Sequence, residues 1–186
     1  NFKATLSTVE GIYSAMLFAR DSGSMDRGKV VSMLQETLVN SQDVLGVYTA
    51  WEPNAFDGKD KDYVGRPGHD ATGRFMPWWY REGGAFKVLP LTAEQMESEK
   101  RLPTGVREGE YYLCPKEKLQ PCIIDPAPYE MGGKMVLMSS FNAPIMVKGQ
   151  FKGTVGVDLR TPSLPFLEEM RNAQLVNLST SDLLED

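Results

Sequence analysis

The chain reads GQFKGTVGVDL from Gly149 to Leu159. Successive side chains of a β-strand point to opposite faces of a sheet, so alternate residues from Phe151 to Leu159 share one face. Most of these alternate residues are apolar, which predicts a strand that buries this face. Asp158 then lies on the opposite face.

Glycine turns divide the preceding sequence into further strands. Gly132-Gly133 separates residues 127–131 from residues 134–147, and Lys148-Gly149 separates the second run from residues 151–159. Turn signals between β-rich runs indicate hairpins. Because consecutive hairpins form antiparallel pairs, this half of the chain predicts an antiparallel sheet.

Other segments upstream also carry strand patterns. Residues 45–51 alternate with a period of two, and residues 85–91 form a second such run after a glycine turn. The short runs 111–113 and 122–124 flank the two cysteines. We expect these two short runs to pair as a hairpin.

The first forty residues have a helical period instead. Apolar residues recur at steps of three and four from Phe2 to Met16, which predicts an amphipathic helix of about 18 residues. A second helix is expected from near Asp26 to near Asn40, and a closing helix over residues 164–176. Helices and strands in this order predict an α+β fold with helices packed on one antiparallel sheet.

Length and charge limit the classes of function. The 186 residues fit one domain, and the net charge of −5 without a basic cluster argues against a nucleic-acid partner. No apolar run approaches the roughly 18–20 residues of a membrane span. One histidine, with no constellation of catalytic or metal-binding residues, predicts neither an enzyme nor a cofactor site.

The two cysteines, Cys114 and Cys122, are too widely spaced for a redox pair and have no histidine nearby to complete a zinc site. Two interpretations remain, a disulfide that closes a short loop or two idle thiols. We favour the disulfide, because the prolines inside both ends of the segment preshape the loop. A disulfide would indicate an oxidising compartment.

The segment HDATGRFMPWWY, from His69 to Tyr80, is the candidate ligand site. Arg74 can grip a carboxylate with paired hydrogen bonds, and Trp78, Trp79 and Tyr80 offer rigid walls with one polar group each. The alternative is that the aromatic residues are ordinary core and that Arg74 is a structural strut.

Three segments of the chain resemble the extracytoplasmic Cache sensor domain of bacterial methyl-accepting chemotaxis receptors. They are VYTAWEPNAFDGKD at residues 47–60, residues 68–79, and residues 149–159, the most specific of the three. The resemblance covers about residues 1–175. It implies a PAS-like fold with a long N-terminal helix, a central antiparallel sheet, and a pocket between the sheet and its loops.

The same resemblance implies a periplasmic sensor that performs no chemistry and binds amino acids, amines, purines or small organic acids. We expect one Cache module over residues 1–176 and a tail over 177–186 that leads toward a membrane segment. Either the receptor has a single module or the chain has been cut. The resemblance also implies a homodimer through the N-terminal helix and signalling across the membrane.

Amino-acid-binding relatives carry an Arg-x-Arg-Pro-Trp-Tyr signature, in which the second arginine binds the ligand carboxylate and a late aspartate binds its ammonium. Here Arg74 matches the first arginine, Met76 replaces the second, and Asp158 occupies the late position. Methionine has no hydrogen-bond fork for a carboxylate. The departure argues against an α-amino acid and leaves two main ligand classes.

The first class is a short monocarboxylate such as formate, acetate, propionate or pyruvate, held by Arg74 and His69. The second class is an amine or quaternary ammonium ion, held by Asp158 and aromatic rings through charge and cation–π contact. Amino acids and purines are further alternatives. We favour the monocarboxylate, because bulky rings around Arg74 suggest a small cavity with further walls from Tyr48, Tyr112 and Phe141.

Overall fold

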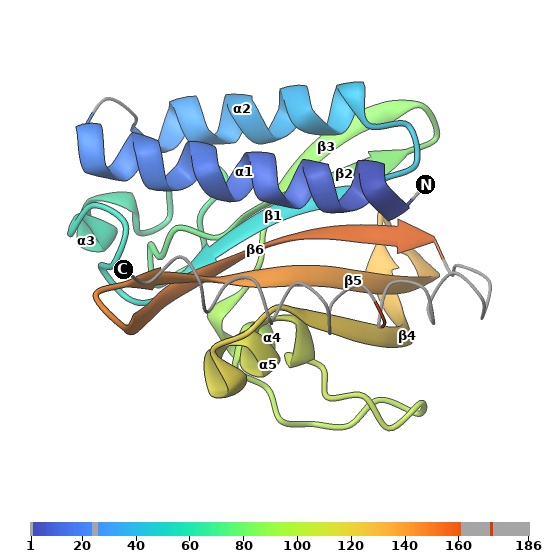
Figure 1. Cartoon of the computed structure of the whole chain (residues 1–186). Coiled ribbons are helices and arrows are strands. Elements are labelled where there is room, and N and C mark those ends of the chain that lie inside the picture. Colours follow the sequence, from blue (N-terminus) through green and yellow to red (C-terminus); the bar gives the residue numbers. More distant parts are fainter. Residues whose placement is uncertain (1, 24–25, 161–171, 173–186) are drawn as a thin grey trace.

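The structure is a computed structural model of the chain and describes residues 2–23, 26–160 and 172 (Figure 1). The closing helix expected over residues 164–176 and the tail from residue 177 lie outside these ranges, apart from residue 172. The described ranges contain two long helices, a six-stranded sheet and three short helices.

The sheet is antiparallel throughout, as the hairpin signals predicted. Its strands lie in the order β3-β2-β1-β6-β5-β4, so the first strand in the chain, β1, pairs with β2 on one side and β6 on the other. The strands are β1 (Gly46–Trp51), β2 (Pro77–Glu82), β3 (Ala85–Pro90), β4 (Cys122–Met131), β5 (Lys134–Val147) and β6 (Gln150–Arg160).

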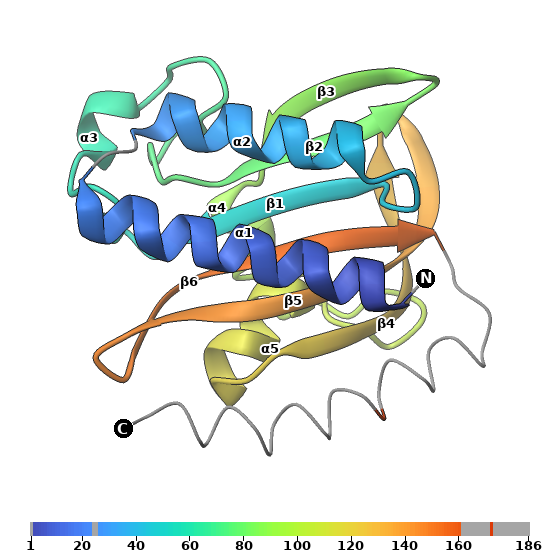
Figure 2. The same ribbon diagram turned by 45° about the horizontal axis from the view of Figure 1, so that its top comes forward.

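Helices α1 (Phe2–Ser22) and α2 (Arg27–Asn40) lie side by side on one face of the sheet (Figures 1 and 2). The side chain of Asp26 caps α2 by accepting a hydrogen bond from the Lys29 backbone N–H at 2.9 Å, which satisfies one of the free donors of the first turn. The apolar stripes of both helices pack on sheet residues such as Trp51 and Val157 in one buried core.

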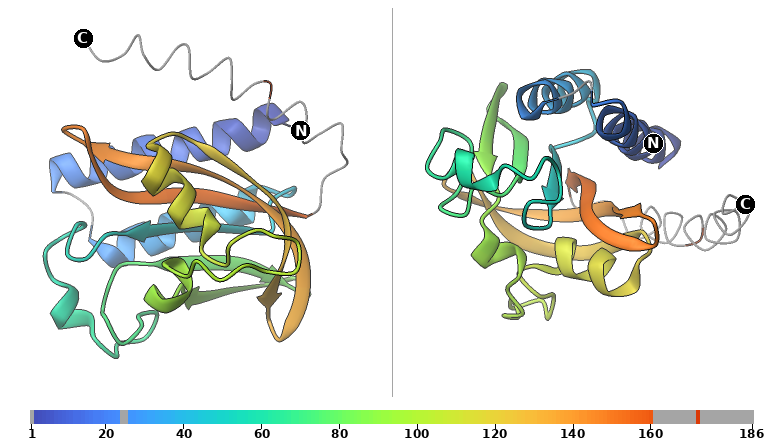
Figure 3. Two further views of the ribbon diagram at one scale, coloured as in Figure 1. Left: turned by 90° about the horizontal axis from the view of Figure 1, so that it is seen from below. Right: turned by 90° about the vertical axis from the view of Figure 1, so that its left-hand side faces the viewer.

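The opposite face of the sheet is covered by the connection between β3 and β4, which contains α4 (Ala93–Met96) and α5 (Glu110–Lys118) (Figures 1 and 3). A third short helix, α3 (Asp60–Tyr63), lies in the loop between β1 and β2. The sheet therefore lies between the α1–α2 pair and the α4–α5 connection.

The hairpin expected from residues 111–113 and 122–124 is wrong in its first half. Residues 111–113 lie in α5, which begins with Glu110 and has Lys116 and Lys118 in its last turn. Both charge placements favour a helix, because a helix is positive at its N-terminus and negative at its C-terminus. A run of three apolar residues is too short to distinguish a helical period from a strand period.

The Sγ atoms of Cys114 and Cys122 are bonded at 2.10 Å, and this disulfide joins α5 to the start of β4. The far end of the β4–β5 hairpin curls back toward β2, where Gly132 lies against the side chain of Glu82. This curl makes the α5 side of the sheet concave and leaves room for a cavity.

Candidate ligand-binding site

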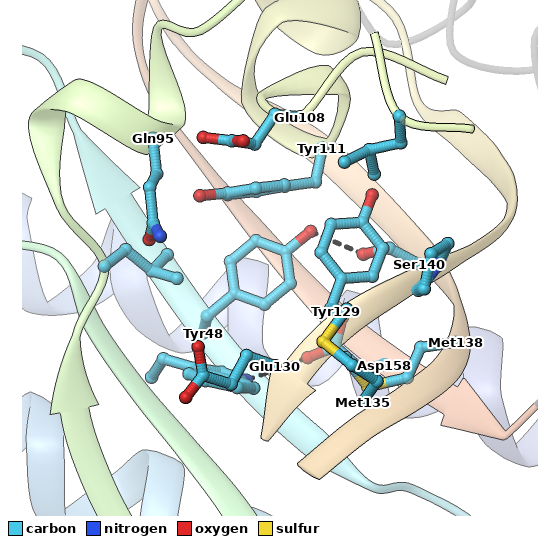
Figure 4. A pocket seen from close by; sticks show the side chains of 14 residues that line it. Tyr48, Gln95, Glu108, Tyr111, Tyr129, Glu130, Met135, Met138, Ser140 and Asp158 are labelled. Carbon is cyan, nitrogen blue, oxygen red and sulfur yellow. Dashed lines mark hydrogen bonds between the residues drawn. The ribbon is translucent and has the colours of Figure 1, made fainter. Parts of the chain in front are cut away.

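A cavity of about 250 Å³ lies between the concave face of the sheet and the α4–α5 connection (Figure 4). Its walls come from five of the six strands and from the segment that covers them. Its lining includes Tyr48, Trp78, Gln95, Glu108, Tyr111, Tyr129, Glu130, Ser140 and Asp158.

Asp158 lies in the central strand β6 and is 7% exposed. The indole N–H of Trp78 donates to its Oδ2 at 2.9 Å. Burial is the largest influence on this carboxyl and raises its pKa to about 6, while hydrogen bonds from Trp78 and Ser140 oppose the rise. Among the residues that the structure describes, no lysine, arginine or histidine forms an ion pair with Asp158.

Two glycines, Gly46 and Gly156, allow the side chains of the cavity floor to lie close to the backbone of the sheet. A Cβ on Gly46 would be 2.7 Å from both Asp158 Oδ2 and Trp78 Nε1. A Cβ on Gly156 would be 2.3 Å from the ring of Tyr48, its cross-strand partner. Because glycine lacks a side chain, the Tyr48 ring and the Trp78–Asp158 pair both lie flat against the backbone.

Aromatic rings stand around the buried carboxylate. The ring of Tyr111 lies edge-to-face with Tyr48 at 5.6 Å and with Tyr129 at 6.5 Å between centroids. The hydroxyl of Tyr48 shares a 2.7 Å hydrogen bond with the Ser140 hydroxyl, which Figure 4 shows at the centre of the cavity. The buried hydroxyl of Tyr129 has no hydrogen-bond partner within the described ranges.

The charge of the cavity is negative. Asp158, Glu108 and Glu130 line it, and no lysine, arginine or histidine does so among the described residues. Aromatic faces also carry partial negative charge, so the rings and the carboxylates favour the same sign of ligand.

Arg74 does not line the cavity. It is 4% exposed, its Nε donates to the Trp51 carbonyl at 3.2 Å, and one terminal nitrogen donates to the Tyr112 hydroxyl at 3.0 Å. Its terminal nitrogens also lie 3.6 Å from a Glu52 oxygen and 3.3 Å from a Glu97 oxygen. The guanidinium therefore has hydrogen-bond and ion-pair partners within the fold.

The other residues expected around Arg74 are dispersed. His69 stacks on Tyr63 in the β1–β2 loop at 4.8 Å between ring centroids, and it does not line the cavity. Trp79 donates its indole N–H to the Val31 carbonyl of α2 at 2.8 Å, on the opposite face of the sheet. Phe141 belongs to the same helix-side core.

Tyr112 and Tyr80 lie beside the cavity without lining it. Tyr112 points toward Arg74, and Tyr80 stacks on Trp78 at 4.7 Å between centroids. Of the nine residues predicted for the ligand site, the structure therefore brings together Tyr48, Trp78 and Asp158.

The chain is similar to known sensor proteins. The chain is 31% identical over 176 residues to the methyl-accepting chemotaxis protein TlpQ of Pseudomonas aeruginosa, a match that covers 89% of this chain and 25% of that protein. It is 35% identical to the solved extracellular domain of mmHK1S-Z3, which is described as a histidine kinase, with a TM-score of 0.68. That match covers 85% of this chain and 51% of the solved one.

This chain is a Cache-type sensor domain. A solved chain called methyl-accepting chemotaxis protein X shares 25% identity and a TM-score of 0.61 with it, over 82% of this chain and 55% of that one. No family model matches the chain. The Cache domain thus spans about a quarter of the curated relative and about half of the solved chains.

The relatives are sensor domains that bind ligands without chemical turnover, so this Cache domain is a binding module and not an enzyme. In the described part of the chain, no three acidic, histidine or cysteine side chains are grouped to hold a metal ion. None of the helices in these ranges is both long and apolar enough to cross a membrane.

Sequence reasoning missed several lining residues of this Cache domain. The sequence predicts a strand at Tyr111 and gives no distinct role to Tyr129 or Ser140. The sequence signal for Ser140 was only partial. The Lys148-Gly149 turn by itself would pair Asp158 with Ser139, and a bulge between Ile145 and Met146 shifts the register so that Ser140 lies opposite Asp158. No comparable signal marks Glu108, which reaches the cavity only because the loop before α5 folds over the sheet.

Proposed function

We propose that this Cache domain senses a small organic cation, an amine or a quaternary ammonium ion, that binds between Asp158 and the aromatic rings. The observation that carries the proposal is a buried carboxylate at a cavity, with no cation beside it in the described residues. A buried charge is unfavourable unless it is paired, so Asp158 lacks a partner that a ligand ammonium would supply.

The aromatic walls support the same ligand class. Trp78, Tyr48, Tyr111 and Tyr129 all line the cavity, and a cation over such rings gains about 0.5–2 kcal/mol per contact, more where water is excluded. A monocarboxylate, the ligand that the sequence favours, would instead enter a cavity with three carboxylates. We therefore adopt the cation, the second of the two ligand classes.

Titration calorimetry tests the proposal with butylamine, 1,4-diaminobutane, choline, acetate, pyruvate and a set of amino acids. We expect saturable binding of at least one amine or of choline. Asp158→Asn should weaken that binding more than about 30-fold, because a desolvated charge pair contributes several kcal/mol. Glu36→Gln, which removes an exposed charge on α2, is the control and should leave the affinity unchanged.

Two results would reject the cation. One is binding of acetate or pyruvate with no response to any cation. The other is cation binding that survives Asp158→Asn at wild-type affinity.

We further propose that the domain is the periplasmic sensor of a transmembrane chemoreceptor. The similarity to TlpQ supports this assignment, and the histidine kinase relative names the other receptor class to test. Fusing the domain to each type of output and measuring the response to the bound cation distinguishes them.

The homodimer expected through the N-terminal helix also stays a proposal. The side chain of Phe18 on α1 is 70% exposed, which would suit a contact with a second copy. Sedimentation of the wild type and of Phe18→Ser, at high protein concentration and with and without cation, tests it. A strict monomer in every case would contradict it.

A further inference from the structure

Arg74 belongs to a cluster of charges beside the cavity. Glu52, at the end of β1, accepts a hydrogen bond from the Tyr112 hydroxyl at 2.7 Å and pairs with Lys116 Nζ at 2.7 Å. Glu97 pairs with Arg74 at 3.3 Å and lies 3.9 Å from Lys116. Two cations and two carboxylates thus connect the end of the central strand β1 with the segment that covers the cavity.

The contacts of Arg74 reach both short helices of that segment. Glu97 is the C-cap residue directly after α4, two positions after Gln95, which lines the cavity. Tyr112 lies in α5 directly after Tyr111, which also lines it. Both of these contacts of Arg74 are therefore within two residues of a side chain that forms the cavity wall.

The two helices are in close contact with each other. A Cβ on Gly109, just before α5, would be 2.2 Å from the Met96 carbonyl at the end of α4. Such close packing leaves no room for one helix to move without the other. A shift at either contact of Arg74 would therefore displace Gln95 and Tyr111 together.

We propose that Arg74 is a positioning residue of the ligand site, which holds α4 and α5 over the cavity through Glu97 and Tyr112 without touching the ligand. This inference rests on the proposed cation site. It gives Arg74 an indirect role in binding that differs from the direct grip on a carboxylate expected from the sequence.

Contacts that do not involve Arg74 also hold the α4–α5 segment in place. The disulfide fixes Cys114 in α5, and the Asp70 carboxylate accepts a hydrogen bond from the Ala93 backbone N–H at 2.9 Å at the start of α4. Loss of Arg74 should therefore loosen the segment without unfolding it.

Arg27 provides a matched control. It is 2% exposed, pairs with Asp57 at 2.8 Å and Asp60 at 2.6 Å, and donates to the Gly73 carbonyl. It is thus as buried and as paired as Arg74. None of these four residues lines the cavity.

The experiment compares Arg74→Met, Tyr112→Phe and Arg27→Met with the wild type. In the first arm, hydrogen–deuterium exchange without ligand should speed up over residues 93–118 in Arg74→Met and Tyr112→Phe. In Arg27→Met it should speed up over residues 54–73 instead. In the second arm, the Kd for butylamine should rise about tenfold in Arg74→Met and stay within twofold in Arg27→Met, and Arg74→Lys should fall between Arg74→Met and the wild type.

Unchanged exchange over residues 93–118 in Arg74→Met would overturn the inference, as would equal loss of affinity in Arg27→Met at a similar fall in Tm. A wild type that binds neither butylamine, 1,4-diaminobutane nor choline would reject the cation site itself. The exchange arm would still decide whether Arg74 holds the segment in place.

Discussion

Asp158→Asn should stabilise the free domain at neutral pH. The folded protein raises the pKa of this carboxyl from 3.8 to about 6, a shift of about two units. Each unit corresponds to about 1.4 kcal/mol, so ionised Asp158 destabilises the fold by about 3 kcal/mol at pH 7. Asparagine keeps an acceptor for the Trp78 indole but adds two donors that need partners, which reduces the expected gain to about 1–2 kcal/mol.

The gain should depend on pH in a defined direction. Because the folded pKa is above the unfolded pKa, the folded state binds more protons between about pH 4 and pH 6. The contribution of Asp158 to stability therefore falls as the pH rises through this window and is constant above it. The variant lacks this fall, so it should be more stable than the wild type at pH 7 and lose this advantage by pH 4, where the cost of the two amide donors remains.

Urea unfolding of both proteins at intervals from pH 4 to pH 8 measures the difference directly, because other titrating groups are common to the two and cancel. In thermal unfolding at pH 7, the same gain should raise the Tm of a domain of this size by roughly 2–8 °C. A variant that is less stable than the wild type by the same amount at every pH would refute the reasoning. Asp158 would then be a structural carboxylate of β6.

Three further predictions concern the same cavity. The Kd for butylamine should be about tenfold higher at pH 5 than at pH 7, because the buried carboxylate of Asp158 is mostly protonated below its pKa of about 6. Calorimetry at both pH values checks this prediction. Replacing Cys114 and Cys122 by serine should lower the free energy of unfolding by roughly 2–3 kcal/mol in urea titrations, since the disulfide closes a short loop. Gly156→Ala should lower the free energy of unfolding by about 1–3 kcal/mol and weaken butylamine binding, because the new Cβ would displace the Tyr48 ring. Gly11→Ala is the control: the space around Gly11 is open, so this variant should lower neither stability nor affinity.

The local patterns of the chain predicted much of its architecture. The helical period from Phe2 to Met16 and the turn signals around Gly132-Gly133 and Lys148-Gly149 gave α1 and the β4–β5–β6 meander, because both periods are properties of neighbouring residues. The strand predicted over residues 111–113 was wrong, because three residues are too few to show whether the apolar period is that of a strand or of a helix.

The ligand site was harder to predict, since it depends on which side chains share one face of the sheet. Trp78 and Trp79 are adjacent in the sequence, yet the first lines the cavity and the second packs under α2, because β2 sends successive side chains to opposite faces. The sequence alone gave both tryptophans the same role. Recognising residues 77–82 as a strand would have separated them.

The sequence by itself determined that Asp158 faces away from the apolar side of β6, because alternation along a strand fixes the face of every residue. Only the tertiary structure decided that this carboxylate lacks a cation among the described residues while Arg74 has two carboxylates near it. The partners of a buried charge come from strands and helices far away in the chain, and only the packing of those elements brings them together.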